Sequence, residues 1–244
     1  MKIIAQKTDA LNNEEFLNNI KEHDFIDAIS LNIALTQDNR ILAYNIRANS
    51  ESIINTIEES TLEQLDNYEI ELLNDALSNI NQKKIKKDIY INIVPFRTGP
   101  LTNENIEFVT NRMNLYIDLL KEILEKYPNL KIKVHSINRS ILTIAKTKLK
   151  NYRLGYVIHD RDLNFTDVDY YVITMNAFDD SIIDLLLNRN KEVILYISSD
   201  YYLSYIYQHY LGEKSTPHLN QTLQRLGIMT NYPEIVNQVL KTSN

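Results

Sequence analysis

The sequence predicts an α/β protein and, within that class, a (β/α)8 TIM barrel. Short β-branched runs alternate with amphipathic helical segments along 244 residues, of which 44% are hydrophobic, enough to bury a substantial core. Several runs, such as Ile-Leu-Tyr-Ile at 194–197, are apolar on both sides of the pleat, as in parallel strands covered by helices. A doubly wound open sheet is the alternative. No Pro/Gly/Ser-rich linker divides the chain, so we expect one domain over residues 1–244.

Nine stretches are expected to form strands. They are Lys2–Gln6, Asp27–Ala34, Ile41–Asn45, Asp88–Val94, Lys131–Ser136, Gly155–His159, Asp169–Thr174, Glu192–Ser198 and Gly227–Thr230. The clearest helix between them has an apolar stripe that runs from Met113 to Tyr127 and stops at Pro128. Ser60 and Glu63 predict a capping box before a short helix.

The region between Asp27 and Asn45 departs from the strand–helix alternation. Two expected strands are separated there by five residues, Thr36–Arg40, too few for a helix. Asp38-Asn39 is a turn pair in which Asn tolerates a left-handed backbone. The sequence therefore predicts a hairpin-like excursion at the second strand.

Composition excludes several functions. Cysteine is absent, so disulfides, zinc thiolates and cysteine nucleophiles are excluded. The net charge of -6 argues against nucleic acid, and Lys83, Lys84, Lys86 and Lys87 are interpreted as a solvated loop. No apolar run of about 18 residues occurs and the chain starts without a signal peptide, so we expect no membrane span and a cytoplasmic location. With four glycines and no P-loop or Gly-x-Gly-x-x-Gly pattern, no phosphate-cradling loop is expected.

Four segments together resemble the glycerophosphodiester phosphodiesterase family. ISLNIALTQDNRILAYN, from Ile29, is similar to the family segment in which a Glu-x-Asp pair precedes Leu-Thr-x-Asp-Gly and then His-Asp. Ile3–Lys7 lies where the family has an apolar pair, Ala, His and Arg. TLEQL at 61–65 and Gly227–Pro233 resemble its Thr-Leu-Glu-Glu-Leu and Gly-x-x-Thr-Asp-x-Pro segments. The resemblance implies a TIM barrel that hydrolyses phosphodiesters of lipid metabolism with a divalent metal such as calcium or magnesium.

Position by position, the resemblance implies that the functional residues are replaced. The substituted positions are Gln6 (His), Lys7 (Arg), Ser30 and Asn32 (Glu-x-Asp), Asn45 (His), and Asn92 and Val94 (Glu-x-Lys). Hard cations normally need carboxylate ligands, and neither Gln nor Asn titrates near neutral pH. We therefore expect no metal cofactor and no family-type catalysis. A small phosphate-containing or polar ligand would meet Lys7, Asn32, Asn45, Asn92, His159 and Asp160 at the carboxyl ends of the strands, here called the mouth.

Other residues offer alternatives. His159, Asp160 and Asp162 follow a strand end and could form an acid–base pair or a partial metal site, although a polar strand end and a helix cap explain them too. His135 is expected to be a hydrogen-bonded strand-end side chain. The aromatic stretch Tyr201–Tyr210 could contact a protein partner, or could be an ordinary covering helix.

Three functions remain open from the sequence. The first is a catalytically inactive barrel, a pseudo-enzyme, with a polar ligand pocket at its mouth. The second is a divergent phosphoric diester hydrolase that uses His159 or Asp160. The third is a non-catalytic protein-interaction scaffold. The fold alone cannot choose among them, because one fold hosts many functions.

Overall fold

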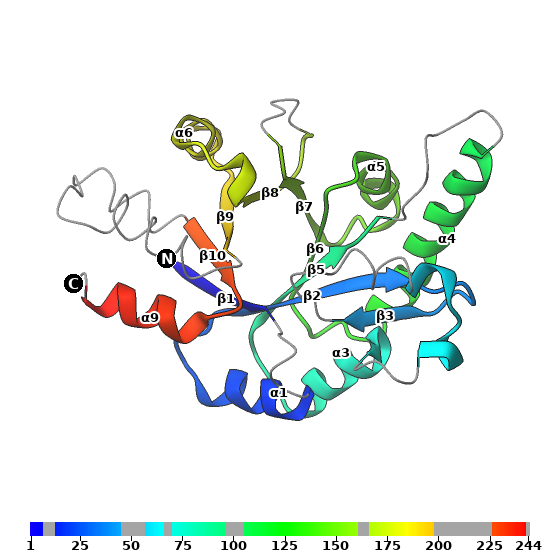
Figure 1. Ribbon diagram of the computed structural model, residues 1–244, viewed down its shortest axis with the longest axis horizontal. Coiled ribbons are helices and arrows are strands. Elements are labelled where there is room, and N and C mark those ends of the chain that lie inside the picture. The colour runs from blue at the N-terminus through cyan, green and yellow to red at the C-terminus, as the bar shows by residue number, and fades with distance from the viewer. Residues whose placement is uncertain are drawn as a thin grey trace.

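Eight parallel strands close into a barrel in the computed structural model, which describes residues 1–6, 13–44, 57–65, 70–95, 105–160, 166–197 and 226–242 (Figure 1). The strands follow the order β1-β10-β9-β8-β7-β6-β5-β2, and pairing of β1 with β2 closes the ring. They are β1 Lys2–Gln6, β2 Ala28–Leu35, β5 Asp88–Ile93, β6 Ile132–Ser136, β7 Arg153–Ile158, β8 Tyr170–Thr174, β9 Glu192–Ile197 and β10 Leu226–Thr230. The predicted TIM barrel is confirmed, and the open sheet is wrong.

Helices surround the barrel on its outer face (Figure 1). They are α1 Asn13–Glu22, α3 Leu73–Gln82, α4 Ile106–Leu124, α5 Arg139–Lys148, α6 Asp180–Asn188 and α9 Pro233–Thr242, with short 3-10 helices at Leu62–Leu65 and Met175–Ala177. The predicted stripe of α4 is buried from Met113 to Leu124. Tyr127 lies past the helix end, where its hydroxyl donates to the Asn74 carbonyl at 2.8 Å.

The predicted hairpin is confirmed beside β2. β3 (Ile41–Tyr44) pairs antiparallel with β2, and Asn39 in the turn has a φ of 62°. A further strand of two residues, β4 (Glu71–Leu72), pairs with β3 and was not predicted. The capping box falls one residue later than expected, because the Thr61 amide donates to Gln64 Oε1 at 2.9 Å.

Charged side chains close the barrel at the amino ends of its strands. This basal cluster consists of Lys2, Asp88, Tyr90, Lys133, Arg153 and Glu192. Lys133 Nζ donates to the Tyr90 hydroxyl at 2.7 Å, and that hydroxyl donates to Glu192 Oε1 at 2.8 Å. Lys133 also lies 3.2 Å from Asp88, and Arg153 lies 2.9 Å from Glu192. Burial alone would raise the pKa of Glu192, but the Tyr90 hydrogen bond and the nearby cations lower it to about 2.

Above the basal cluster, apolar side chains fill the middle of the barrel. Ile4, Ala28, Tyr170, Val172, Ile194 and Met229 belong to one buried group contributed by β1, β2, β8, β9 and β10. The interior is therefore packed, as in other TIM barrels, and a ligand inside it could be reached only from the mouth. Within the described part of the chain, no helix is long and apolar enough to cross a membrane.

Candidate functional site

Polar side chains from four neighbouring strands gather at the mouth. Gln6, Ser30, Asn32, Asn92 and His135 come from β1, β2, β5 and β6. The parallel register aligns Gln6 with Ser30, and it aligns Asn32 with Asn92 and then His135. Since residues two apart on a strand share a face, Ser30 and Asn32 project together, in line with their predicted orientation. In most barrels of this architecture, catalytic groups come from this end of the strands.

Asn32 and Asn92 bind each other. Asn92 Nδ2 donates to Asn32 Oδ1 at 2.9 Å, between adjacent parallel strands. Asn32 is only 2% exposed. A buried side-chain amide needs partners for its donors and acceptors, and this pair supplies one to each residue.

Unlike the asparagine pair, two buried atoms at the mouth lack a partner. Gln6 is 5% exposed and Ser30 is 1% exposed, and among the described residues neither Gln6 Oε1 nor Ser30 Oγ has a hydrogen-bond partner. The Gln6 side chain also hydrogen-bonds the Tyr196 hydroxyl. Burial raises the pKa of Tyr196 and this hydrogen bond lowers it, and the effect of burial is the larger. Leaving a buried acceptor unpaired costs about 1–3 kcal/mol, so both atoms call for a donor from a bound molecule or water.

His135 is buried beside the asparagines and is neutral. Its Nδ1 lies 3.2 Å from the Tyr170 hydroxyl, so the predicted hydrogen-bonded strand-end histidine is confirmed. Complete burial lowers the pKa of His135 to about 3. Near neutral pH this imidazole therefore carries no positive charge, so it can neither attract a phosphate electrostatically nor donate a proton readily.

His159 and Asp160 follow β7 and are exposed. His159 Nδ1 lies 3.2 Å from Thr174 Oγ1, whose hydroxyl also donates to the His159 carbonyl at 3.3 Å. Within the described residues, no hydrogen bond joins these two side chains to each other or to the asparagine pair. They do not form a preassembled acid–base pair, and Asp162 lies outside the described residues.

The structure does not place the remaining predicted site residues together. Lys7 and Asn45 lie outside the described residues, as does Tyr201–Tyr210, so their roles stay predictions. Val94 follows the end of β5 and packs on the apolar cluster beneath the hairpin, beside Ala34 and Leu42. A valine in that cluster contributes packing and offers a ligand no polar contact.

The described mouth does not fit a hard divalent cation. Calcium and magnesium prefer several oxygens, with carboxylates supplying the charge. Ser30, Asn32 and Gln6 offer only neutral oxygens, and Asn92 turns its amide nitrogen toward Asn32. In the ranges described above, no group of three or more His, Cys, Asp or Glu side chains could hold a metal.

Some members of the site went unrecognised in the sequence. Tyr170 and Tyr196 reach the interior from β8 and β9, where they contact His135 and Gln6. Period-two alternation could have suggested both, since each shares a strand face with other interior positions. What sequence could not reveal is that strands so distant in the chain bring these tyrosines against β1 and β6.

Comparison with known proteins shows which class has this architecture. No family model matches the chain, and no curated protein sequence matches it. Among solved structures, a phosphodiesterase from Oleispira antarctica in complex with its product sn-glycerol-3-phosphate is similar with a TM-score of 0.71 at 14% identity, over 99% of this chain and 97% of that chain.

Two glycerophosphodiester phosphodiesterases show the same architecture. The Parabacteroides distasonis protein has a TM-score of 0.70 at 13% identity, over 99% of this chain and 97% of that one. The Thermotoga maritima protein has a TM-score of 0.57 at 14% identity, over 97% of both chains. The chain thus has the fold of glycerophosphodiester phosphodiesterases, as the resemblance implied. Identities this low establish the fold and leave activity to be argued from the site.

Proposed function

We propose that this protein is a divergent, catalytically inactive relative of the glycerophosphodiester phosphodiesterases that binds a small polar or phosphate-containing ligand at its mouth. The hydrogen bond between Asn32 and Asn92 is the observation that supports the proposal most directly. It joins two of the positions where the resemblance implies carboxylates. Because these two neutral amides hydrogen-bond each other, no cation is needed to offset repulsion between charged groups at these positions.

Loss of hydrolysis follows from the chemistry of the remaining groups. Asparagine, glutamine and serine do not exchange protons near neutral pH, and general acid–base catalysis typically contributes about 10²–10⁴-fold to a rate. His135 is the titratable histidine among the buried mouth residues, and its pKa of about 3 keeps it neutral. Lacking both a charged ligand set and a positioned proton donor, the described mouth retains binding groups without the means to cleave a phosphodiester.

Binding is supported by the unsatisfied acceptors. Gln6 Oε1 and Ser30 Oγ can each accept a hydrogen bond from a ligand hydroxyl. Lys7 directly follows Gln6 in the sequence and would supply a positive charge for a phosphate. The similar Oleispira antarctica phosphodiesterase holds sn-glycerol-3-phosphate, which combines hydroxyls with a phosphate. We therefore extend that class of ligand to this chain as part of the proposal.

Two measurements on the whole protein test the proposal. Isothermal titration with sn-glycerol-3-phosphate should give stoichiometric binding, which Gln6→Leu and Ser30→Ala each weaken by about tenfold. Incubation with glycerophosphocholine and millimolar calcium or magnesium should release no glycerol phosphate. Metal-dependent hydrolysis that survives purification would contradict inactivity and favour a divergent hydrolase. Binding unchanged by either substitution would contradict the assigned pocket.

A further inference from the structure

A cavity lies at the opposite end of the barrel from the mouth. Its volume is about 410 Å³, and it sits between the segment joining α3 to β5 and the segment joining α4 to β6. Both segments lead into the amino ends of strands. Small-molecule pockets typically measure about 300–1,000 Å³, so the volume suits a ligand of modest size.

The lining combines lysines with an apolar base. Lys84, Lys86, Lys87 and Lys131 line the cavity together with Ile85 and Leu130, and no acidic residue does. The lining of the cavity is thus positively charged, although the whole chain has a net charge of -6. Ile85 is 5% exposed, so it forms a fixed apolar surface beneath the lysines.

Three of these lysines have no partner among the residues that the structure describes. Within the described residues, Lys84, Lys86 and Lys131 form no ion pair and donate no side-chain hydrogen bond. Lys87 donates to the His23 carbonyl at 3.3 Å. Unpaired ammonium groups around one concave surface raise the local concentration of anions.

The backbone holds Lys84 in a conformation that lysine disfavours. The Ile85 amide bonds the Ile80 carbonyl at 3.2 Å and the Lys84 amide bonds the Asn81 carbonyl at 3.1 Å, so α3 ends in a Schellman motif. Lys84 occupies its left-handed position with a φ of 54°, where glycine is usual. Glycine would make the turn more stable, and a side chain kept there at a cost in stability points to a role for that side chain.

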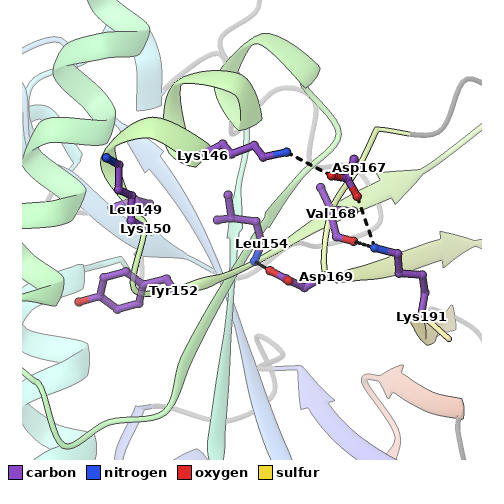
Figure 2. A pocket seen from close by; sticks show the side chains of 9 residues that line it. All are labelled: Lys146, Leu149, Lys150, Tyr152, Leu154, Asp167, Val168, Asp169 and Lys191. Carbon is purple, nitrogen blue, oxygen red and sulfur yellow. Dashed lines mark hydrogen bonds and ion pairs between the residues drawn. The ribbon is translucent and has the colours of Figure 1, made fainter. Parts of the chain in front are cut away.

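In a neighbouring cavity, two lysines form ion pairs with an acidic side chain of the protein. This cavity lies between α5, β7 and β8 and has a volume of about 200 Å³. Figure 2 shows Lys146 and Lys191 reaching toward Asp167 there. Their ammonium groups lie 3.3 and 3.5 Å from its carboxylate. Lys191 also donates to the Val168 carbonyl at 2.6 Å. Lys146 and Lys191 are thus neutralised by an acidic neighbour, whereas no acidic residue lines the larger cavity.

We propose that the cavity around Lys84, Lys86 and Lys131 binds a small organic anion that has an apolar body. The anionic head contacts the unpaired ammonium groups, and the body lies on Ile85 and Leu130. The concave shape favours a small molecule over an extended polyanion, which would need a continuous basic surface. This site is separate from the mouth and does not rest on the function proposed there.

Titration of the whole protein with octyl phosphate, inorganic phosphate and octanol tests whether binding needs both an anionic head and an apolar body. Octyl phosphate should bind at least about tenfold more tightly than either partial probe, because only it offers both charge and apolar area. Amide NMR shifts should change at residues 84–87 and 129–131. Equal binding of octanol, shifts confined to the mouth, or a single-stranded RNA that competes more tightly at these lysines would each overturn the proposal.

Matched variants separate binding from folding. Lys84→Gly removes one cation while improving the turn, so it should raise Tm by about 2 °C and weaken octyl phosphate binding by about tenfold. Lys131→Gln should weaken binding to a similar extent. Lys146→Gln, in the neighbouring cavity, should leave binding unchanged. Equal affinity of Lys84→Gly, Lys131→Gln and the unmodified protein would overturn the proposal.

Discussion

Asn92 Nδ2 lies 2.9 Å from Asn32 Oδ1 across two parallel strands. Two carboxylates at the same positions would repel each other unless a cation lay between them, because like charges this close destabilise each other. The amide pair removes the repulsion and the need for the cation together. A neutral mouth is thus a stable alternative to a metal site on the same scaffold.

Restoring the implied charges should make the fold depend on metal. In Ser30→Glu/Asn32→Asp/Asn92→Glu, clustered carboxylates in a buried site should lower stability by about 3–5 kcal/mol, or about 10 °C in Tm. Calcium should recover most of that loss by binding only the folded state. Circular dichroism melts in EDTA and in 10 mM calcium measure both effects. The unmodified protein serves as the control, and a calcium-dependent Tm in it would contradict the neutral site.

His135 should make the protein less stable as the pH falls below 6.5. Its folded-state pKa of about 3 lies below the value of 6.5 expected in the unfolded chain. The unfolded state therefore binds the proton first, and stability present above pH 6.5 is lost progressively between pH 6.5 and 3. Between pH 7 and 5 the loss from this group is about 2 kcal/mol.

Urea unfolding at pH 7 and pH 5 measures this contribution. Between the two pH values, the unfolding free energy of His135→Asn should fall by about 2 kcal/mol less than that of the unmodified protein. His159→Asn is the matched control, because it makes the same substitution at an exposed histidine. If the unfolding free energy of His135→Asn and of the unmodified protein fell equally between pH 7 and pH 5, His135 would not be buried as a neutral group.

The strands were predictable because each contains its own signal. Runs such as Ile194–Ile197 are apolar on both faces, and Asp38-Asn39 marks the hairpin turn chemically. β4 could not be predicted, since two residues are too short to show alternation. The capping box was misplaced by one residue because Ser60 and Thr61 are both good caps, with Glu63 and Gln64 three residues after each.

The site was predictable only where the signal was local. Ser30, Asn32 and Asn92 could be placed by their spacing along a strand, but the hydrogen bond between Asn32 and Asn92 depends on strands 60 residues apart being adjacent. The basal cluster was missed for the same reason. Lys2 and Lys133 each look like ordinary charges flanking a strand until barrel closure brings them to Glu192.

Removing the charge of Glu192 should destabilise the barrel strongly. Glu192→Gln leaves Lys2, Lys133 and Arg153 facing one carboxylate, Asp88, and breaking a buried pair typically costs about 3–5 kcal/mol. Urea unfolding at pH 7 measures the loss. Lys133→Met added to Glu192→Gln should recover part of it, because the most buried unpaired cation is then removed. Asp167→Asn, an exposed ion-pair partner, should leave the urea midpoint unchanged, and an equal loss there would contradict the special role of burial.

Gly155 should tolerate no side chain while Tyr170 is present. A Cβ at Gly155 would overlap the Tyr170 ring, which packs edge-on against Tyr90 with centroids 5.6 Å apart and is held by His135. Gly155→Ala should therefore cost about 1–3 kcal/mol of unfolding free energy. Gly227→Ala is the matched control, because its nearest contact, Ile194 Cγ1 at 3.3 Å, can shift slightly. In a Tyr170→Ala background, Gly155→Ala should cost almost nothing. The double-mutant cycle should therefore give a coupling energy of about 1–3 kcal/mol. Additive losses of unfolding free energy would show that the Tyr170 ring is not what excludes the side chain.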